Sequence, residues 1–451
     1  MRHKTLIKRD WHDPVQVLSG LSQQGLVIAL LSDGSPARGR WSYLAAEPAE
    51  VLDIAPSDQR DAFMALDALL GPLNDAPFDQ DPNLPPFQGG LMGLASYEFG
   101  ARAEPVSLGR DKDWPDLICG RFDGLLAFDH QERVVWAIGA GPKCKENADQ
   151  ALTWLGLPSR SEYSGTLAEP LVPILLAKAY EDSVARVIEK IAAGEIFQAN
   201  IARGWKGRLR SDAQPIDLLR RLVNESPAPF AGYLAWNTLA LVSNSPERFL
   251  RIRQGSSRRI EARPIKGTIG RGSDLVHDQA QIESLKHSLK DRAENLMIVD
   301  LMRNDLARVC RAGSVAVPDL FAVETFVNVH HLVSTVVGEV LPGIGLGAVL
   351  RATYPPGSIT GAPKVQAMQV IAGLEAPRGP YCGSLFWAGY DGAMDSSVLI
   401  RTTAFVRDEE GWGFKTHAGA GIVADSDPVA ERRETETKIS AIAKALSGVG
   451  V

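Results

Sequence analysis

Acidic residues recur at helical spacing in two segments of the sequence. Asp291 and Glu294 lie three apart in DRAENLMIVDLMRND, and Glu431 and Glu434 lie three apart in AERRETETK, with Lys438 following. Residues at this spacing share one face of a helix. Each face is either a solvated charged surface or one half of a metal site. Two carboxylates from separate helices suit Mg²⁺, because this ion keeps several waters and takes few protein ligands.

A lysine and a glutamate stand out at the ends of extended runs. Lys266 lies between an extended run and a glycine in EARPIKGTIG, where it is either a solvated charge or an amine directed into a pocket. Glu247 follows a proline in SNSPERFL and is either a turn residue or a carboxyl group at a strand end. An amine and a carboxyl group are the types needed for nucleophilic and acid–base chemistry.

Glycine-rich and basic segments could bind an anion. PPGSITGAPK offers backbone N–H groups and the Ser358 hydroxyl at a helix start, and in HAGAGIV the residues Gly419 and Gly421 let a ligand touch a strand. A helix cap and a packing constraint explain these two segments equally well. Arg401, in the apolar run VLIRTTAF, needs either a structural salt bridge or a ligand carboxylate. His331 opens another apolar run, as a core histidine or a site residue.

Length, charge and cysteine usage limit the possible classes. The 451 residues exceed the ~250–300 at which one core usually stops growing, so two domains or one elaborate layered domain is expected. A net charge of −6 argues against a nucleic-acid or anionic-membrane partner. The four cysteines lie far apart, which fits a reduced cytoplasm. We find no signal-peptide pattern and no run of ~18 apolar residues, so a cytoplasmic location is expected.

The order of predicted elements indicates an α+β fold. The first third is mainly antiparallel β, with a glycine-rich strand at 88–100 and a hairpin at 125–139. Residues 158–173 have no apolar period and contain three prolines, which predicts a linker between an N-terminal β-rich region, 1–157, and a second region, 174–451. There, helical periodicity ends at Gly194, one or two long helices span 277–308, and SSVLIRTTAFV reads as one strand. A last helix has an apolar stripe of Ile439, Ile442, Ala443 and Leu446.

From about residue 176 to 446 the chain resembles the chorismate-utilising enzymes. This family includes component I of anthranilate synthase, isochorismate and salicylate synthases, and component I of aminodeoxychorismate synthase. The resemblance is carried, in family order, by SPERFL, RPIKGT, DRAENLMIVDLMRND, HHLVS, GSITGAPK, YCGS, MDSSVLIRT, AGAGIVADSDP and ETETK. The N-terminal third matches more loosely, through LLSDGS, GRWSYLAAEP and GGLMGLASYEFG. The resemblance implies antiparallel sheets packed as a sandwich with helices outside.

Two positions relate the chain to one branch of that family. The position of Lys266 is typically alanine in the anthranilate, isochorismate and salicylate enzymes, whereas the aminodeoxychorismate branch carries P-I-K-G-T. Gln198 stands where isochorismate and salicylate enzymes place a water-activating lysine. The resemblance therefore implies amination of chorismate to 4-amino-4-deoxychorismate. Tyr381 departs from the branch, whose members often have tryptophan there, and matches anthranilate synthases. Anthranilate synthase component I and a non-catalytic amino-acid-binding regulatory subunit are the alternatives.

The resemblance also implies a role for each candidate residue. Lys266 would be the nucleophile, Glu247 the acid that protonates the leaving hydroxyl, and His331 a neighbour of the ring. Mg²⁺ would be held by Glu294 and Glu434, supported by Asp291 and Glu431. The remaining residues would bind substrate: Arg401, Tyr381, Gly419, Gly421, Ser358 and Lys438.

The implied chemistry sets requirements on charge and on partners. A lysine of pKa ~10.4 must be made less basic, by burial or by neighbours such as Arg263 and Mg²⁺, while Glu247 must stay protonated. None of the four cysteines lies in a G-x-C-x-G-x-Q context, so ammonia would come from a glutamine amidotransferase small subunit. Some relatives hold tryptophan in the N-terminal sandwich, and residues 30–35 are the candidate lining of such a pocket.

Overall fold

Antiparallel strands from both ends of the chain build the larger of two sheets. The computed structural model describes residues 3–21, 25–35, 39–73, 81–325, 329–448 and 450. Within these ranges the larger sheet has twelve strands, in the order β1 (Lys4–Asp10), β8 (Val134–Ala140), β7 (Gly124–Asp129), β3 (Trp41–Ala45), β2 (Val27–Leu31), β11 (Phe230–Trp236), β12 (Leu239–Ser245), β21 (Thr402–Asp408), β22 (Gly411–Ile422), β10 (Gln198–Arg208) and β18 (Gly361–Ala362), with β9 (Val172–Pro173) paired to β10.

The smaller sheet stacks on the larger one. Its ten described strands follow the order β15 (Ile265–Gly270), β17 (Val329–Glu339), β14 (Arg259–Ala262), β13 (Arg248–Arg253), β20 (Met394–Val398), β19 (Ser384–Gly389), β5 (Gly90–Ala95), β6 (Leu117–Phe122) and β4 (Glu50–Ile54), with β16 (Ala316–Thr325) paired to β17. One buried cluster joins the facing sides of the two sheets, including Ile28 and Leu241 from the larger sheet and Met92 and Leu385 from the smaller. The predicted α+β sandwich is confirmed.

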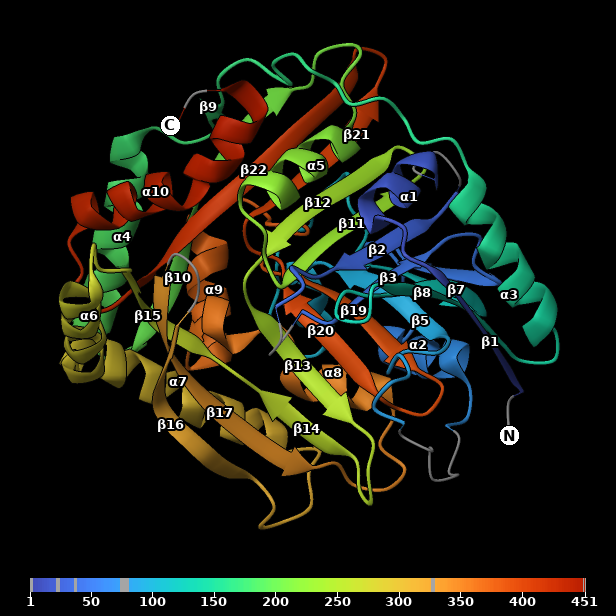
Figure 1. Ribbon diagram of the computed structural model, residues 1–451. Coiled ribbons are helices and arrows are strands. Elements are labelled where there is room, and N and C mark those ends of the chain that lie inside the picture. Colours follow the sequence, from blue (N-terminus) through green and yellow to red (C-terminus); the bar gives the residue numbers. More distant parts are fainter. Residues whose placement is uncertain are drawn as a thin grey trace.

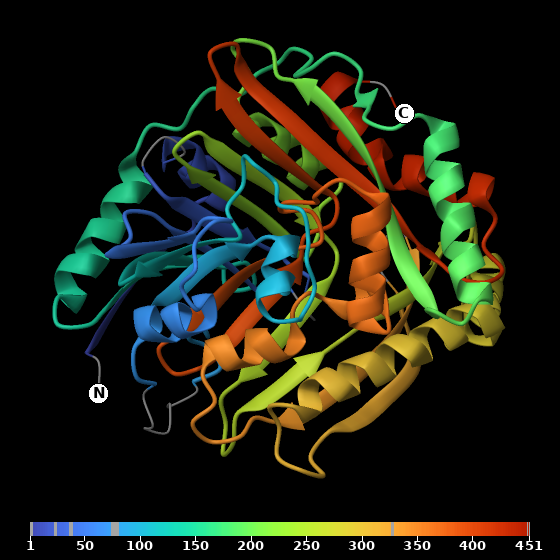
Figure 2. The same cartoon turned by 180° about the vertical axis from the view of Figure 1, so that it is seen from behind.

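Helices cover the outer faces. Four helices pack their apolar faces on the larger sheet: α1 (Pro14–Leu21), α3 (Cys144–Thr153), α5 (Pro215–Glu225) and α10 (Pro428–Ser447). They follow one another across the upper part of Figure 1. Figure 2 shows α2 (Ala62–Leu70), α7 (Leu289–Ala307) and α8 (Leu346–Thr353) together against the smaller sheet. Around the β10–β22 end lie α4 (Ala177–Ala192) and α9 (Lys364–Leu374), and α6 (Leu275–His287) lies against β15, β16 and β17.

Local patterns predicted several of these elements correctly. The stripe of α10 is buried as expected, and Gly194 takes a positive φ of 76° just past α4. The segment 277–308 is two helices, because Ser288 interrupts the run and its hydroxyl caps α7 by accepting the Asp291 backbone N–H at 3.2 Å. No helix in the described ranges is long and apolar enough to cross a membrane.

Two predicted strands are shorter than expected. The strand predicted at 88–100 ends at Ala95 and gives way to a 3₁₀ helix, η1 (Tyr97–Arg102). The run SSVLIRTTAFV is not one strand, because Leu399–Arg401 leave the smaller sheet and the chain enters the larger one at Thr402. Backbone bonds fix this crossing, as Cys382 N–H donates to the Leu399 carbonyl and Asn244 N–H donates to the Arg401 carbonyl. Arg401 therefore lies at a sheet-to-sheet corner with a φ of 51°.

The N-terminal region contributes strands to both sheets. Leu31 of β2 lies opposite Ala231 of β11, and Gly93 of β5 lies opposite Phe386 of β19. Both sheets thus depend on pairing between residues far apart in the sequence. The division of the chain at 158–173 stays a prediction.

Candidate active site

Two glycines of β22, Gly419 and Gly421, leave backbone without side chains opposite a group of polar residues. A Cβ built on Gly421 would lie 2.3 Å from Gln198 Nε2 and 3.4 Å from Lys266 Nζ. A Cβ on Gly419 would lie 2.4 Å from Asn200 Oδ1 and 2.9 Å from the Tyr381 hydroxyl oxygen. Any side chain at either glycine would therefore displace these groups. The two glycines let residues from β10, β15 and the segment before β19 converge on one strand.

Lys266, on β15, is the amine at the centre of this group. Burial lowers the pKa of Lys266, and the nearby charges of Glu294 and Glu247 oppose that shift. The expectation that Arg263 would help to lower it is wrong, because Arg263 is paired with Glu324 of β16. Desolvation thus drives the lysine toward its neutral, nucleophilic form.

Glu247 precedes β13 and supplies the carboxyl group beside this amine. Its side chain is buried, and burial raises the pKa of Glu247 against a hydrogen bond with Ser358 and the charges of Lys266 and Lys438. Ser358 comes from the 3₁₀ turn η3 (Gly357–Ile359), which opens the segment predicted to bind an anion. A carboxyl group held toward its protonated form next to a lysine held toward its neutral form is an arrangement suited to acid-assisted substitution.

The acidic residues of α7 and α10 lie on the same side of the site. Glu434 pairs with Lys438 at 2.6 Å, and Lys438 Nζ also donates to the Gly419 carbonyl at 2.9 Å. Burial raises the pKa of Glu431, which accepts a hydrogen bond from the Ser426 hydroxyl, and it also raises the pKa of Glu294.

Asp291 approaches the chain just after Lys266. A Cβ on Gly267 would lie 2.9 Å from the Asp291 Cγ. Burial is the main reason that the pKa of Glu294 is raised, and the negative charges of Asp291 and Glu431 raise it further. The structure therefore brings the predicted acidic residues near the amine.

This donor set fits Mg²⁺ better than a metal enclosed by protein. Within the described residues, no group of three or more His, Cys, Asp or Glu side chains is placed to surround a metal ion. Mg²⁺ is typically held by one or two carboxylates together with waters and substrate oxygens. A divalent cation between α7 and α10 would also offset the burial and mutual repulsion that raise the pKa values of Glu294 and Glu431.

Three other predicted residues have distinct surroundings. Arg401 is exposed and forms no ion pair with any described residue, which removes the structural salt bridge as its explanation. Tyr381 is buried and stacks on His417 with ring centroids 5.2 Å apart. His331 is buried, and its Nδ1 is 2.8 Å from the Thr268 hydroxyl oxygen, which ties β17 to β15 two residues beyond Lys266.

Sequence reasoning missed Asn200 as a site residue. Gln198 and Asn200 lie two apart on β10, so their side chains share one face. Both are buried in a strand that is otherwise largely apolar at this end. The signal available in the sequence was this pair of amides at alternate positions of a strand.

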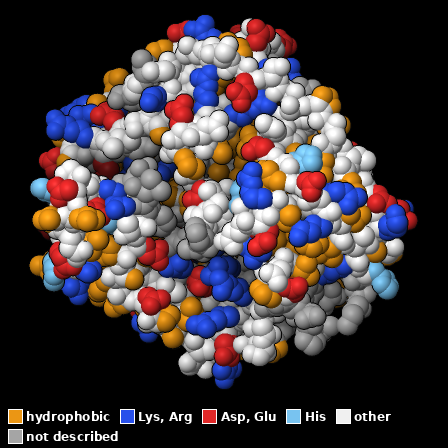
Figure 3. Space-filling model, in the orientation of Figure 1, with side chains coloured by type: hydrophobic (Ala, Val, Ile, Leu, Met, Phe, Trp, Pro, Cys, Tyr) orange, Lys and Arg blue, Asp and Glu red, His pale blue; other side chains and the backbone are white. Residues whose placement is uncertain are grey.

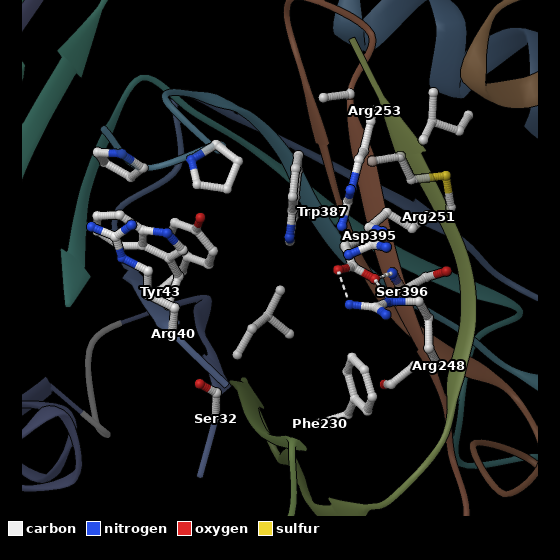
Figure 4. A pocket seen from close by; sticks show the side chains of 18 of the residues that line it. Ser32, Arg40, Tyr43, Phe230, Arg248, Arg251, Arg253, Trp387, Asp395 and Ser396 are labelled. Atoms are coloured by element: carbon white, nitrogen blue, oxygen red, sulfur yellow. Dashed lines mark hydrogen bonds and ion pairs between the residues drawn. The ribbon is translucent and has the colours of Figure 1, made fainter. Parts of the chain in front are cut away.

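A separate pocket of about 510 Å³ lies between the sheets, and we call it the inter-sheet pocket. Leu30, Leu31 and Ser32, from the segment predicted to line an amino-acid pocket, form part of its wall. Figure 4 shows Tyr43 and Trp387 facing the cavity, with Phe230 and Arg248 on the other side. The face in Figure 3 is hollowed near its centre, over β11, β13 and β20.

The inter-sheet pocket is distinct from the site of Lys266. Arg248 lines it and is fixed by Asp395, with Arg248 Nε and the Asp395 carboxylate 2.8 Å apart. Glu247, one residue earlier, belongs to the other site. Neighbouring residues on an extended chain point in opposite directions, so the start of β13 separates the inter-sheet pocket from the site of Lys266.

The stacked sheets, the buried amine and acid, and the facing carboxylates define a class of enzyme that can substitute a group on a small anionic ligand. Comparison with known families agrees with that class. Residues 29–444 match the family described as chorismate binding enzyme, and the chain belongs to this family.

Relatives with two different activities are similar to this chain. It is 39% identical over 374 residues to aminodeoxychorismate synthase component 1 of Salmonella typhimurium, covering 80% of this chain and 77% of that protein. It is 36% identical over 380 residues to anthranilate synthase component 1 of Thermus thermophilus, covering 82% and 80%. The crystal structure of anthranilate synthase component I from Streptococcus pneumoniae superposes with a TM-score of 0.77 at 26% identity, over 91% of this chain and 93% of that one.

Proposed function

We propose that this protein is an aminodeoxychorismate synthase component, which converts chorismate and ammonia to 4-amino-4-deoxychorismate on the route to para-aminobenzoate and folate. The observation that carries the proposal is the position of Lys266, whose Nζ lies against Gly421 with its pKa lowered by burial and Glu247 nearby. The name of the Salmonella relative supports the same activity.

The first step of the proposed reaction uses Lys266 and Glu247. The neutral Lys266 amine forms a bond to ring carbon 2, and the two ring double bonds shift toward carbon 4. The bond between carbon 4 and its hydroxyl oxygen breaks, and Glu247 gives a proton so that water leaves. The raised pKa of Glu247 and the lowered pKa of Lys266 favour the protonation states that this step needs.

The second step releases the lysine. Ammonia forms a bond to carbon 4, the double bonds return to their original positions, and the bond between carbon 2 and Lys266 Nζ breaks. The Lys266 nitrogen, which became an ammonium group when it bonded to carbon 2, leaves as a neutral amine. One proton passes from the new ammonium group on carbon 4 to the Glu247 carboxylate, so both residues return to their starting forms and the product leaves with a neutral amine. The enolpyruvyl group stays on the ring, which distinguishes this product from anthranilate.

Substrate binding would use the cations and glycines around β22. Arg401, Tyr381 and the backbone of Gly419 and Gly421 hold the enolpyruvyl carboxylate in this proposal. The ring lies beside His331, with Ser358 and Lys438 lining the pocket. Mg²⁺, held by Glu294 and Glu434 with support from Asp291 and Glu431, supplies positive charge for the ring carboxylate.

A second protein would supply the ammonia. The relatives are named as components, which supports a partner, and we take it to be a glutamine amidotransferase. Of the four cysteines, Cys119, Cys310 and Cys382 are buried and none lies in a glutaminase motif. A cytoplasmic location is part of the proposal, and the four free cysteines fit it.

The inter-sheet pocket would take tryptophan. Its aromatic walls, Trp41, Tyr43 and Trp387, suit a planar apolar ring, and Ser32 with the nearby arginines offers donors to a carboxylate. Because Lys266 does not line this pocket, the pocket would hold a regulator or a structural ligand and not the reacting substrate.

Product analysis tests the proposal. The purified chain with chorismate, Mg²⁺ and an ammonium salt should form aminodeoxychorismate without releasing pyruvate, and glutamine should not replace ammonium. Anthranilate with an equal amount of pyruvate would assign the chain to the anthranilate synthases instead. No turnover with either nitrogen source would support the regulatory-subunit alternative.

A further inference from the structure

His417 lies in line with the candidate active site on β22. His417, Gly419 and Gly421 occupy alternate positions of this strand, so they share one of its faces. Lys266 lies against Gly421, and the Tyr381 hydroxyl lies against Gly419. His417 therefore comes next along the same face, at the end of the site that Tyr381 forms.

The imidazole of His417 contacts the site through its flat ring. It stacks on the Tyr381 ring with centroids 5.2 Å apart and an angle of 28° between the planes. Its side chain forms no hydrogen bond or ion pair with any residue that the structure describes. Stacked aromatic pairs stabilise a structure beyond the area that they bury. The stack is thus the contact by which His417 acts on the site.

The opposite strand leaves room for this ring. Gly204 of β10 lies directly opposite His417 in the sheet register. A Cβ on Gly204 would lie 2.8 Å from His417 Cδ2 and 2.9 Å from its Nε2. The third near atom, Ile174 Cδ1 at 2.9 Å, ends an exposed side chain that can move away. A side chain at position 204 would therefore displace the imidazole from Tyr381.

Neighbouring charges keep the imidazole neutral. Desolvation is the main reason that the pKa of His417 is lowered to about 4, and the charges of Arg378 and Lys415 lower it further. The charge of Asp111 opposes this shift, but Asp111 also pairs with Lys415 at 3.4 Å. Arg378 Cζ lies 5.9 Å from the centroid of the Tyr381 ring, so a charged imidazole on that ring would be repelled. The neutral form stacks without this cost.

The direction of the Tyr381 hydroxyl matters for a carboxylate ligand. Burial raises the pKa of Tyr381, so its hydroxyl stays a proton donor. A hydrogen bond weakens steeply when the donor turns away from the acceptor. A contact that fixes the plane of the ring also fixes the place of the hydroxyl beside Gly419.

We infer that His417 is a positioning residue, which holds the Tyr381 ring by stacking so that the hydroxyl of Tyr381 meets the substrate carboxylate at Gly419. This inference rests on the proposed function, because it takes Tyr381 as a ligand of the enolpyruvyl carboxylate. It does not depend on which product the enzyme forms.

Variants of His417 separate the ring from its polar atoms. H417A removes the stack, which corresponds to a rise of about two- to twelvefold in KM for chorismate. The value of kcat should change by less than about twofold, because the carboxylate is held equally in the ground and transition states. H417F keeps a flat ring and should restore the KM to within about twofold. H417N keeps an N–H group without the ring and should behave like H417A.

A substitution on the opposite strand tests the same contact independently. G204A should raise the KM for chorismate when His417 is present and should add little in the H417A background, because the two changes act on one contact. G207A is the matched control on β10. A Cβ there would lie 2.5 Å from Phe414 Cζ, so it crowds an aromatic ring that does not touch Tyr381. G207A should lower the melting temperature and leave the KM for chorismate unchanged.

Three results would overturn the role of His417. They are an unchanged KM in H417A, recovery by H417N but not by H417F, and an equal rise in KM in G207A. Formation of anthranilate by the unsubstituted protein would refute the proposed function and leave this comparison intact, since KM is measured with either product. Without any turnover, the Kd of chorismate from calorimetry takes the place of KM in the same set of variants.

Discussion

The active site and the inter-sheet pocket treat buried charge differently. Around Lys266 the groups are held toward their uncharged forms, with the pKa of the lysine lowered and that of Glu247 raised by burial. In the inter-sheet pocket, burial alone would lower the pKa of Arg248, but the charge and hydrogen bond of Asp395 together with the charge of Glu261 outweigh burial, and the pKa is raised. The groups that must react are left without full compensation, whereas Arg248, which only shapes a cavity wall, has its charge paired.

The largest effect should come from replacing the lysine. K266R keeps the positive charge but introduces a guanidinium that stays protonated, so turnover should fall by about 10⁴-fold or more. The peptide containing residue 266 should carry no adduct after incubation with chorismate and Mg²⁺. K206R, at an exposed lysine on β10, is the control and should keep full activity. An active K266R would show that Lys266 acts only as a fixed positive charge, as Arg248 does, and not as a nucleophile.

The pH dependence of lysine modification should reveal the second reacting group. The neutral fraction of Lys266 increases as pH rises toward its lowered pKa, whereas the protonated fraction of Glu247 decreases as pH passes its raised pKa. The rate should therefore rise and then fall with pH. E247Q should be slower by about 10²–10³-fold and should lose the fall at alkaline pH. A bell-shaped profile that persists in E247Q would contradict the assignment of the acid.

Removing one acidic ligand should weaken metal binding. E434Q keeps the size of the side chain but loses its charge, and a weakening of Mg²⁺ binding by at least about ten- to hundredfold is expected. Calorimetric titration with Mg²⁺ and the Mg²⁺ concentration needed for half-maximal turnover should agree. E410Q, at an exposed carboxylate in the β21–β22 hairpin, should bind Mg²⁺ normally. Equal binding by both variants would exclude Glu434 as a ligand.

The smallest effect should be seen at the inter-sheet pocket. Tryptophan at about 100 times its Kd stabilises the folded state by about 2.7 kcal/mol, which should raise the melting temperature by a few degrees. W387L removes one aromatic wall and should abolish this rise without changing the Mg²⁺ dependence. A rise of equal size in W387L would show that tryptophan binds elsewhere.

Local patterns predicted the parts of the fold that depend on neighbouring residues. The stripe on α10 and the end of α4 just before Gly194 follow from helical periodicity and from the conformational freedom of glycine. The corner at Arg401 did not follow, because it is fixed by backbone bonds from Cys382, just before β19, and from Asn244 on β12, which lie elsewhere in the sequence. The pairing of Arg263 with Glu324 was missed for the same reason, because Glu324 lies on β16, 61 residues further along the chain.

The candidate site shows the same limit. The residue types of Lys266, Glu247 and the four carboxylates are enough to suggest their chemistry from the sequence. The contact of Ser358 with Glu247 depends on bringing together segments far apart in the sequence. The orphan oxygens of Gln198 and Asn200 depend on which neighbours fail to reach them, and a sequence does not contain that information.

Each sheet combines strands from the N-terminal region with strands from the rest of the chain, and this has a consequence for synthesis on the ribosome. The strand β2 is made early, but its partner β11 emerges only when residues near Ala231 leave the exit tunnel. Until then, β2 presents an unpaired apolar edge, which is a template for pairing with another nascent chain. The first 157 residues made alone should therefore aggregate, and coexpression of residues 158–451 should restore solubility. A chain built this way depends on protection by chaperones until its second half arrives.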